Sequence, residues 1–242
     1  MEQKSTYTTA KEIISQLTSN IQPEVVKHKA HFFQAFPGGY GEGDFFCGAN
    51  NPRCHDLVKQ MADFSLKEIR ILLWSKWHEA RLCALFWMVV HLKKSEGVMK
   101  EKIPDLYLKG ALAGKINQWD LVDLSAADIM GKYEYELQTH ELSERFAQSN
   151  DLWLNRIAIV STYYWIRKND FDMTLRLCTK FLNHPHDLMH KACGWMLREV
   201  GKRDKNALTH FLNKNKINMP RTMLRYAIEH YSKQEREMFL KK

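Results

Sequence analysis

Five apolar stretches, each interrupted by polar residues, recur along the chain at nearly constant spacing, and this regularity limits the fold more than any other feature. From one stretch to the next, the steps between reference residues are 38, 37, 35 and 34 residues. The reference residues are Arg81, Trp119, Arg156, Lys191 and Arg225. Repeats built from helical hairpins have similar periods, about 34 residues in TPR proteins and roughly 40 to 47 in HEAT or armadillo proteins. We therefore expect an all-α fold, a HEAT-like helical-repeat solenoid with a concave binding face.

The spaces between these stretches also have helical patterns. Second helices are expected there, for example over Phe171 to Leu182 and Asn206 to Leu212. The aromatic residues and the glycine of the TPR consensus are absent, which favours the HEAT-like interpretation. The alternative is an irregular helical domain, in which the spacing reflects only the average length of a helix and its loop.

Helix-breaking residues gather near the N-terminus. Five of the 11 glycines fall between Phe36 and Gly48, so this stretch must be a loop. We predict a helical segment over residues 1–36, broken at Pro23, and a Gly-rich loop over residues 37–51. Asn51 is expected to cap the next helix, with Pro52 in its first position. The whole chain, residues 1–242, is expected to form a single domain of this repeat type.

The composition excludes several classes of protein. The chain is 45% apolar, too apolar to stay disordered, yet its longest apolar run, Leu82 to Val90, has nine residues, whereas a membrane span needs about 20. The polar start lacks the apolar core of a secretory signal, and five scattered cysteines do not resemble a disulfide framework. We expect a cytoplasmic protein, associated with the nucleoid if bacterial. The net charge of +8 favours a polyanionic partner.

Three of the apolar stretches carry charged residues in positions suited to binding. Trp119 and Asp123 are four residues apart, so an indole and a carboxylate would share one helical face. Arg156 stands directly before an apolar run, where its guanidinium could bind phosphate oxygens in a bidentate manner. Trp195 and Arg198 are three residues apart and also share a face. Structural roles are the alternatives: core indoles, a capping or surface carboxylate, and ion-paired arginines.

At these places the sequence resembles the AlkD-type DNA alkylation repair glycosylases, a family of HEAT-like repeat proteins. The resemblance extends from Tyr40 to Tyr226. The order of the matching pieces, together with the repeat spacing, makes the combination specific. The pieces are Tyr40-Gly-Glu-Gly-Asp44 with Gly48 and Pro52, His78-Glu79-x-Arg81, Trp119-Asp-x-Val-Asp123, Trp153-Leu-x-Arg156, Lys191-Ala-x-Gly-Trp195-x-Leu-Arg198-Glu199, and Arg225-Tyr226-Ala227.

This resemblance implies an activity and a set of roles. Family members excise positively charged alkylated bases, chiefly 3-methyladenine and 7-methylguanine, from double-stranded DNA by hydrolysing the N-glycosidic bond. They hold the lesioned pair against an open surface without a base-specific pocket, and they need no cofactor and no metal. The implied roles are a catalytic carboxylate for Asp123, contacts with the sugar of the lesion nucleotide for Trp119 and Trp195, phosphate binding for Arg156 and Arg198, and an aromatic near the DNA for Tyr40.

The residues suit this chemistry, with some departures from the family pattern. A fixed carboxylate such as Asp123 would stabilise the positive charge that builds on the sugar as the glycosidic bond breaks. We find no lysine near Trp119 suited to a Schiff base, so we predict a monofunctional glycosylase, expected to act as a monomer. Asn155 replaces a frequent second arginine, and Tyr164 replaces a phosphate-binding lysine. Phosphate contacts are therefore expected to be fewer or redistributed.

Other functions remain as alternatives. A non-catalytic binder of damaged or branched DNA would share the basic face but release no base. A scaffold for protein interactions would instead carry mixed or acidic charge on that face. Cys47 and Cys54 with His55 fit no common zinc spacing, and capping or surface exposure is the favoured interpretation of the polar run from His184 to His190. No Walker A or dinucleotide-binding motif occurs.

Overall fold

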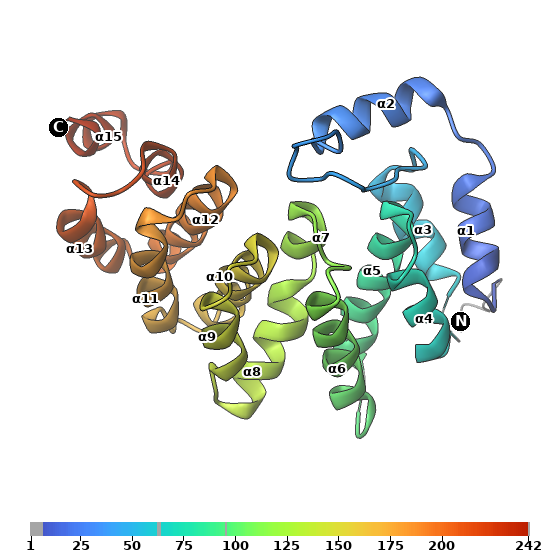
Figure 1. The fold of residues 1–242 in the computed structure, drawn as a ribbon. Helices are drawn as coiled ribbons and strands as arrows, with labels where there is room; N and C mark the ends of the chain where they lie inside the picture. Colours follow the sequence, from blue (N-terminus) through green and yellow to red (C-terminus); the bar gives the residue numbers. More distant parts are fainter. Residues whose placement is uncertain (1–6, 62–63, 95, 242) are drawn as a thin grey trace. The chain divides into compact units, whose positions relative to one another are not determined.

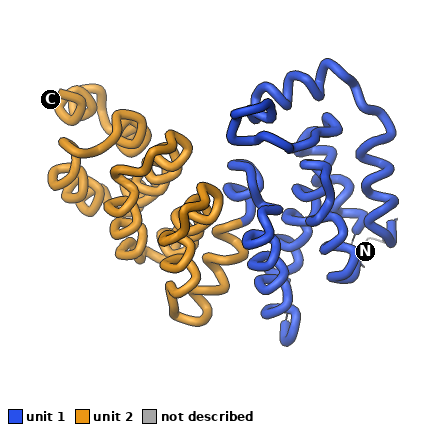
Figure 2. The backbone as a smooth tube through the Cα atoms, viewed as in Figure 1, with its two compact units in different colours: residues 1–125 blue, residues 126–242 orange. Residues whose placement is uncertain are grey.

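The computed structural model describes residues 7–61, 64–94 and 96–241, so the first six residues of the predicted N-terminal helical segment lie outside the described residues. Helices make up most of these residues (Figure 1). An isolated β-bridge joins Phe45 and Trp77. The all-α helical-repeat fold is thus confirmed. The chain divides into two compact units, Met1–Ser125 and Ala126–Lys242 (Figure 2).

The first unit is organised around a buried central helix. Every residue from His78 to Met88 in this helix, α5, is buried, because α1, α3, α4, α6 and α7 all pack against it. A helix enclosed in this way is apolar on all sides, as the run from Leu82 to Val90 is. The helices of this unit are α1 (Ala10–Thr18), α2 (Pro23–Phe32), α3 (Asn51–Lys59), α4 (Leu66–Leu73), α5 (His78–Lys94), α6 (Met99–Leu112) and α7 (Trp119–Asp123).

The second unit repeats a simple packing pattern. Helix α10 packs against α12, and α12 packs against α14, so three of the five predicted stretches lie on successive neighbouring helices. Helices α9 and α13 pack against α10 and α12 respectively, and α11 packs against both of these, as expected for second helices. The elements of this unit are η1 (Ala127–Gly131), α8 (Lys132–Leu137), α9 (Glu141–Ala147), α10 (Leu152–Ile166), α11 (Asp172–Lys180), η2 (Phe181–Asn183), α12 (Asp187–Arg203), α13 (Lys205–Asn215), α14 (Arg221–Ala227) and α15 (Lys233–Leu240).

The N-terminal segment follows the sequence prediction with a correction at one cap. Helix α2 begins at Pro23, which confirms the predicted break. The predicted cap of α3 was wrong by one position, because Asn51 is the first helical residue and Asn50 is the cap. The side-chain oxygen of Asn50 accepts a hydrogen bond from the backbone N–H of Arg53 at 3.0 Å. Proline is tolerated at the following position, Pro52, because the N–H it lacks would have no partner within the helix.

Gly194 lies in the middle of α12, where glycine costs about 1 kcal/mol relative to alanine. A Cβ atom at this position would lie 2.5 Å from Cβ of Tyr226 and 2.6 Å from the backbone oxygen of Met223. The absence of a side chain at Gly194 therefore lets α12 and α14 approach closely, and the packing between the two helices compensates for the cost of the glycine. No helix of the described residues is long and apolar enough to cross a bilayer.

Candidate functional site

The short helix α7 carries both members of the predicted acid and aromatic pair. Trp119 is its first residue and Asp123 its last, and both side chains are half-buried. The indole of Trp119 stacks on Phe33, with ring centroids 5.3 Å apart, and meets the ring of Phe32 edge to face at 5.8 Å. Both phenylalanines stand at the C-terminal end of α2. The two helices thus form a shared aromatic cluster.

A cavity of about 430 Å³ opens beside α7. Its lining includes Asp123, the predicted catalytic carboxylate, and Trp119, one of the residues predicted to bind the substrate. Phe32, Phe33 and His78 also line it. These three were not among the predicted site residues, although the adjacent aromatics at the end of an amphipathic segment were a usable signal.

Behind the cavity, a buried histidine joins two carboxylates. The ring nitrogens of His78, a residue that is 1% exposed, lie 2.9 Å from Oδ2 of Asp120 and 2.9 Å from Oδ2 of Asp44. Burial alone would lower the pKa of His78, but the carboxylates of Asp120 and Asp44 raise it to about 9. The imidazole is therefore protonated at neutral pH, and each ring N–H donates to a carboxylate. Asp120 directly follows Trp119, so this network fixes α7.

Arg81 extends the same network toward the chain segment before α7. Its guanidinium donates to the carboxylate of Asp44, to the side-chain oxygen of Asn117, and to the backbone oxygen of Lys115 at 3.2 Å. The amide of Gln118 adds a hydrogen bond to the backbone oxygen of Phe33 at 3.1 Å. A five-residue helix has little stability of its own. Its position depends on these nonlocal hydrogen bonds.

Glu79 holds the end of the Gly-rich loop in place. Its buried carboxylate accepts hydrogen bonds from the backbone N–H groups of Cys47 at 2.9 Å and Gly48 at 3.0 Å. Lys29 of α2 completes the set with an ion pair at 3.0 Å. Burial alone would raise the pKa of Glu79, but Lys29 and the N–H of Cys47 outweigh it, so the pKa is lowered. The carboxylate thus ties α2 and the Gly-rich loop to α5.

Tyr40 was predicted to lie near the DNA. It is half-buried in the Gly-rich loop, and its hydroxyl donates to the backbone oxygen of Phe32 at 3.5 Å. It is not among the residues that line the cavity. Its hydroxyl thus contacts the end of α2 that also carries the aromatic neighbours of Trp119.

In the second unit, the predicted residues lie on the neighbouring helices α10 and α12. Arg156 is 4% exposed, and its guanidinium donates to the backbone oxygen of Leu188. Trp195 is half-buried, with its ring 5.9 Å from that of Tyr163. Arg198 is partly exposed and forms an ion pair with Glu229. These side chains combine two aromatic rings with two guanidinium groups on packed helices.

The two departures from the family pattern have structural explanations. The amide of Asn155 donates to the backbone oxygens of Phe146 at 2.9 Å and Ser149 at 2.8 Å, which closes the turn between α9 and α10. The ring of Tyr164 packs 5.4 Å from that of Tyr135. The guanidinium of Arg167 lies 5.2 Å from the ring centroid of Tyr164. Both departing residues therefore contribute to packing within the unit.

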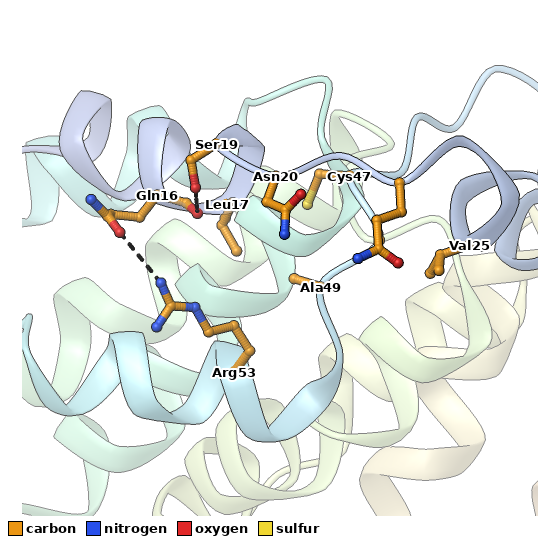
Figure 3. Close-up of a pocket in the computed structure, with 10 residues that line it drawn as sticks. Gln16, Leu17, Ser19, Asn20, Val25, Cys47, Ala49 and Arg53 are labelled. Atoms are coloured by element: carbon orange, nitrogen blue, oxygen red, sulfur yellow. Dashed lines mark hydrogen bonds between the residues drawn. The ribbon is translucent and has the colours of Figure 1, made fainter.

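A second cavity in the first unit, of about 340 Å³, lies between α1, α2 and the start of α3. Figure 3 shows its polar lining, in which the guanidinium of Arg53 donates to the side-chain oxygen of Gln16 at 3.3 Å. It contains none of the predicted site residues and no aromatic ring. Within the described part of the chain, no group of three or more His, Cys, Asp or Glu side chains is arranged to hold a metal ion.

The fold and the cavity together define an all-α helical-repeat protein with a carboxylate and aromatic rings at its candidate site. A family model described as DNA alkylation repair enzyme matches residues 13–231. The chain therefore belongs to the DNA alkylation repair enzyme family, which indicates a role in the repair of alkylated DNA.

A solved structure, a predicted DNA alkylation repair enzyme from Enterococcus faecalis, has a similar fold. The TM-score is 0.69 at 16% identity, and the alignment covers 88% of this chain and 100% of that chain. A likeness at this low identity shows the fold alone. Comparison with curated protein sequences gives no match.

Proposed function

We propose that this protein is a monofunctional DNA glycosylase that hydrolyses the N-glycosidic bond of positively charged alkylpurines, chiefly 3-methyladenine and 7-methylguanine, in duplex DNA. The observation that carries the proposal is the placement of Trp119 and Asp123 on one short helix beside a single cavity. Membership of the alkylation repair family supports the choice of substrate. The proposal includes HEAT-type repeats, a monomeric enzyme and a cytoplasmic location.

The reaction asks little of the protein beyond electrostatics and positioning. An alkylated purine leaves with the electron pair of the bond between C1′ and nitrogen, which neutralises the base and leaves positive charge on the sugar. The carboxylate of Asp123 stabilises this charge, orients the water whose oxygen bonds to C1′ and accepts the proton that this water releases. The face of the Trp119 indole attracts the positive charge through a cation–π interaction of about 0.5 to 2 kcal/mol. Both effects favour a cationic lesion over a normal base.

Residues of the second unit are proposed to hold the DNA backbone. Trp195 would contact the sugar of the lesion nucleotide, and Arg198 would bind a neighbouring phosphate. Arg156 is 4% exposed and donates to the Leu188 carbonyl, so little of its guanidinium is accessible to a phosphate. Partly exposed Arg198 is thus the better placed of the two arginines.

The test of the proposal is release of 7-methylguanine from methylated duplex DNA. We expect release by the wild-type protein and a loss of at least about 100-fold in Asp123→Asn, since carboxylates of this kind contribute on that scale. Trp195→Ala should also lose activity while its circular dichroism spectrum stays that of the wild type. Equal release by wild type and Asp123→Asn would refute the role of Asp123.

A second candidate function is non-catalytic binding of damaged or branched DNA. It rests on the departures from the family pattern at Asn155 and Tyr164, because their side chains are used for contacts within the second unit and do not help to hold a lesion for cleavage. Such a protein would bind duplex DNA in a salt-dependent manner. It would release no base under conditions in which binding is saturated.

A further inference from the structure

Rings and cations alternate over three packed helices of the second unit. Helix α10 packs against both α8 and α12. The ring of Tyr163 in α10 lies 5.9 Å from that of Trp195 in α12, and the ring of Tyr164 lies 5.4 Å from that of Tyr135 in α8. Two cations from the turn after α10 lie over these tyrosine rings. The ring and cation array consists of Trp195, Tyr163, Arg167, Tyr164, Lys168 and Tyr135.

Each cation of the array is placed by two tyrosine rings. Cζ of Arg167 lies 4.8 Å from the ring centroid of Tyr163 and 5.2 Å from that of Tyr164. Nζ of Lys168 lies 5.7 Å from the ring centroids of both Tyr135 and Tyr164. A ring face attracts a cation within about 6 Å of its centroid. The rings therefore restrict the positions that the two charged groups adopt.

The two cations differ in how far their charge is matched within the protein. Arg167 forms an ion pair with Asp128 at 2.9 Å. Lys168 is exposed and forms no ion pair with any carboxylate of the described residues. A tyrosine ring attracts an ammonium group through its quadrupole, without a net charge on the ring. The positive charge of Lys168 is therefore held in place and left open to an anion from outside the protein.

A tight turn fixes the backbone that carries Lys168. Its N–H donates to the backbone oxygen of Trp165 at 2.8 Å, and the N–H of Asp170 donates to the same oxygen at 3.1 Å. Asn169 between them has a φ of 61°, in the left-handed region that asparagine adopts more readily than most residues. Helices commonly end in this way. Because backbone and side chain are both held, Lys168 loses less conformational entropy on binding a ligand than a free surface lysine would.

The ligand that fits this lysine is a phosphate group of duplex DNA. A lysine ammonium binds phosphate oxygens as a point charge, and phosphate contacts position a protein on the duplex without reading its sequence. Trp195, at the other end of the array, is the residue proposed to contact the sugar of the lesion nucleotide. Every sugar within a DNA strand lies between two phosphates, so a cation along the array from Trp195 can meet the backbone of the same duplex.

We propose that Lys168 binds a backbone phosphate of duplex DNA, and that Tyr164 and Tyr135 are positioning residues that direct its ammonium group. The proposal rests on the proposed function, which brings duplex DNA to Trp195. Position 164 then contributes to phosphate binding through a ring that directs a cation four residues later in the chain. Lys168 adds a phosphate contact to the one assigned to Arg198.

The experiment measures binding of unmodified duplex DNA by the full-length protein, using fluorescence anisotropy over a series of salt concentrations. Lys168→Gln should lower the slope of log affinity against log salt concentration by about 0.9, because one phosphate fewer is neutralised. Lys168→Arg keeps the charge and should keep the wild-type slope. Lys180→Gln is the matched control, because it removes one charge from an exposed lysine of α11 that is not part of the array. It should bind like wild type.

Replacing Tyr164 separates a positioning role from a purely structural one. Tyr164→Leu removes a ring face and should weaken DNA binding about two- to five-fold, whereas Tyr164→Phe keeps the face and should bind like wild type. In a Lys168→Gln background, Tyr164→Leu should have no further effect on affinity. A loss of the same size in that background would show that Tyr164 acts on the fold alone, and would overturn its positioning role.

A wild-type slope in Lys168→Gln, or an equal change of slope in Lys180→Gln, would overturn the phosphate contact. So would binding of duplex DNA by the wild type that does not depend on salt. If Lys168→Gln lowers the slope but the wild type releases no 7-methylguanine from methylated DNA, the phosphate contact stands and the glycosylase proposal fails. If the wild type releases the base and Lys168→Gln keeps the wild-type slope, the glycosylase proposal stands and the phosphate contact fails.

Discussion

Nε2 of His78 donates a hydrogen bond of 2.9 Å to Oδ2 of Asp120, the residue that follows Trp119 in α7. The other ring nitrogen donates to Asp44 in the Gly-rich loop. Only the protonated imidazole can donate on both sides. A buried charge in α5 therefore determines how α7 presents Trp119 and Asp123 to the cavity.

This relationship predicts a pH dependence of stability. The pKa of His78 is raised from 6.5 to about 9 in the folded protein, so its stabilising contribution is complete below 6.5 and is lost as the pH rises through 9. His78→Gln cannot donate to both carboxylates, and at neutral pH it should be less stable by about 3 to 5 kcal/mol. Urea unfolding of wild type and variant should show this difference shrinking toward alkaline pH. A difference that stays constant to about pH 10 would contradict the assigned protonation.

The two aspartates of α7 should behave differently when replaced. Asp120→Asn removes the charge that pairs with buried His78, so the variant should lose about 3 to 5 kcal/mol of stability. Asp123 is half-buried and lines the cavity. Asp123→Asn should therefore change the free energy of unfolding by less than about 1 kcal/mol, although it should abolish base release. Thermal unfolding and release of 7-methylguanine, measured on both variants, separate the roles. Equal destabilisation would mean that Asp123 is also structural.

The sequence was sufficient to predict features that depend on local spacing. The four-residue spacing of Trp119 and Asp123 predicts that they share a helical face, and both lie on α7. The packing of α10 on α12, and of α12 on α14, follows the repeat period. Contacts between distant segments could not be predicted in this way. His78 is separated from Asp44 by 34 residues and from Asp120 by 42, and no periodic pattern reveals which polar residues meet in a core.

The ion pair between Glu79 and Lys29 predicts that the protein loses stability at acidic pH. The pKa of Glu79 is lowered from 4.5, so its stabilising contribution is present above 4.5 and is lost as the pH falls below it. Glu79→Gln should be less stable at neutral pH by about 3 to 5 kcal/mol, because it leaves Lys29 without its buried partner. Lys29→Met in the same background should recover part of this loss. Unfolding at neutral pH and at about pH 3 tests both statements, and an equal difference at the two values would contradict them.

A side chain at position 194 should destabilise the protein by a steric clash between α12 and α14. In Gly194→Ala the new methyl group would meet the backbone oxygen of Met223 at 2.6 Å, so α12 and α14 must separate. The cost should be about 1 to 3 kcal/mol. Gly201→Ala is the matched control in α12, since its methyl group would meet the end of the flexible Leu208 side chain. Chemical unfolding should show a smaller loss for the control, and equal losses would show that the backbone contact is not decisive.

Replacing Arg198 should change DNA binding, whereas replacing Arg156 should change the stability of the protein. If Arg198 binds a phosphate, Arg198→Ala should lower the slope of log affinity against log salt concentration by about 0.9 on unmodified duplex DNA. Glu229→Gln removes the acid paired with Arg198 and should strengthen binding. Arg156→Ala should instead lose about 1 to 3 kcal/mol of stability, because it removes a buried side chain and its hydrogen bond to the Leu188 carbonyl. Fluorescence anisotropy across a salt series measures the slopes. If Arg198→Ala keeps the wild-type slope, Arg198 makes no phosphate contact and its ion pair with Glu229 is purely structural.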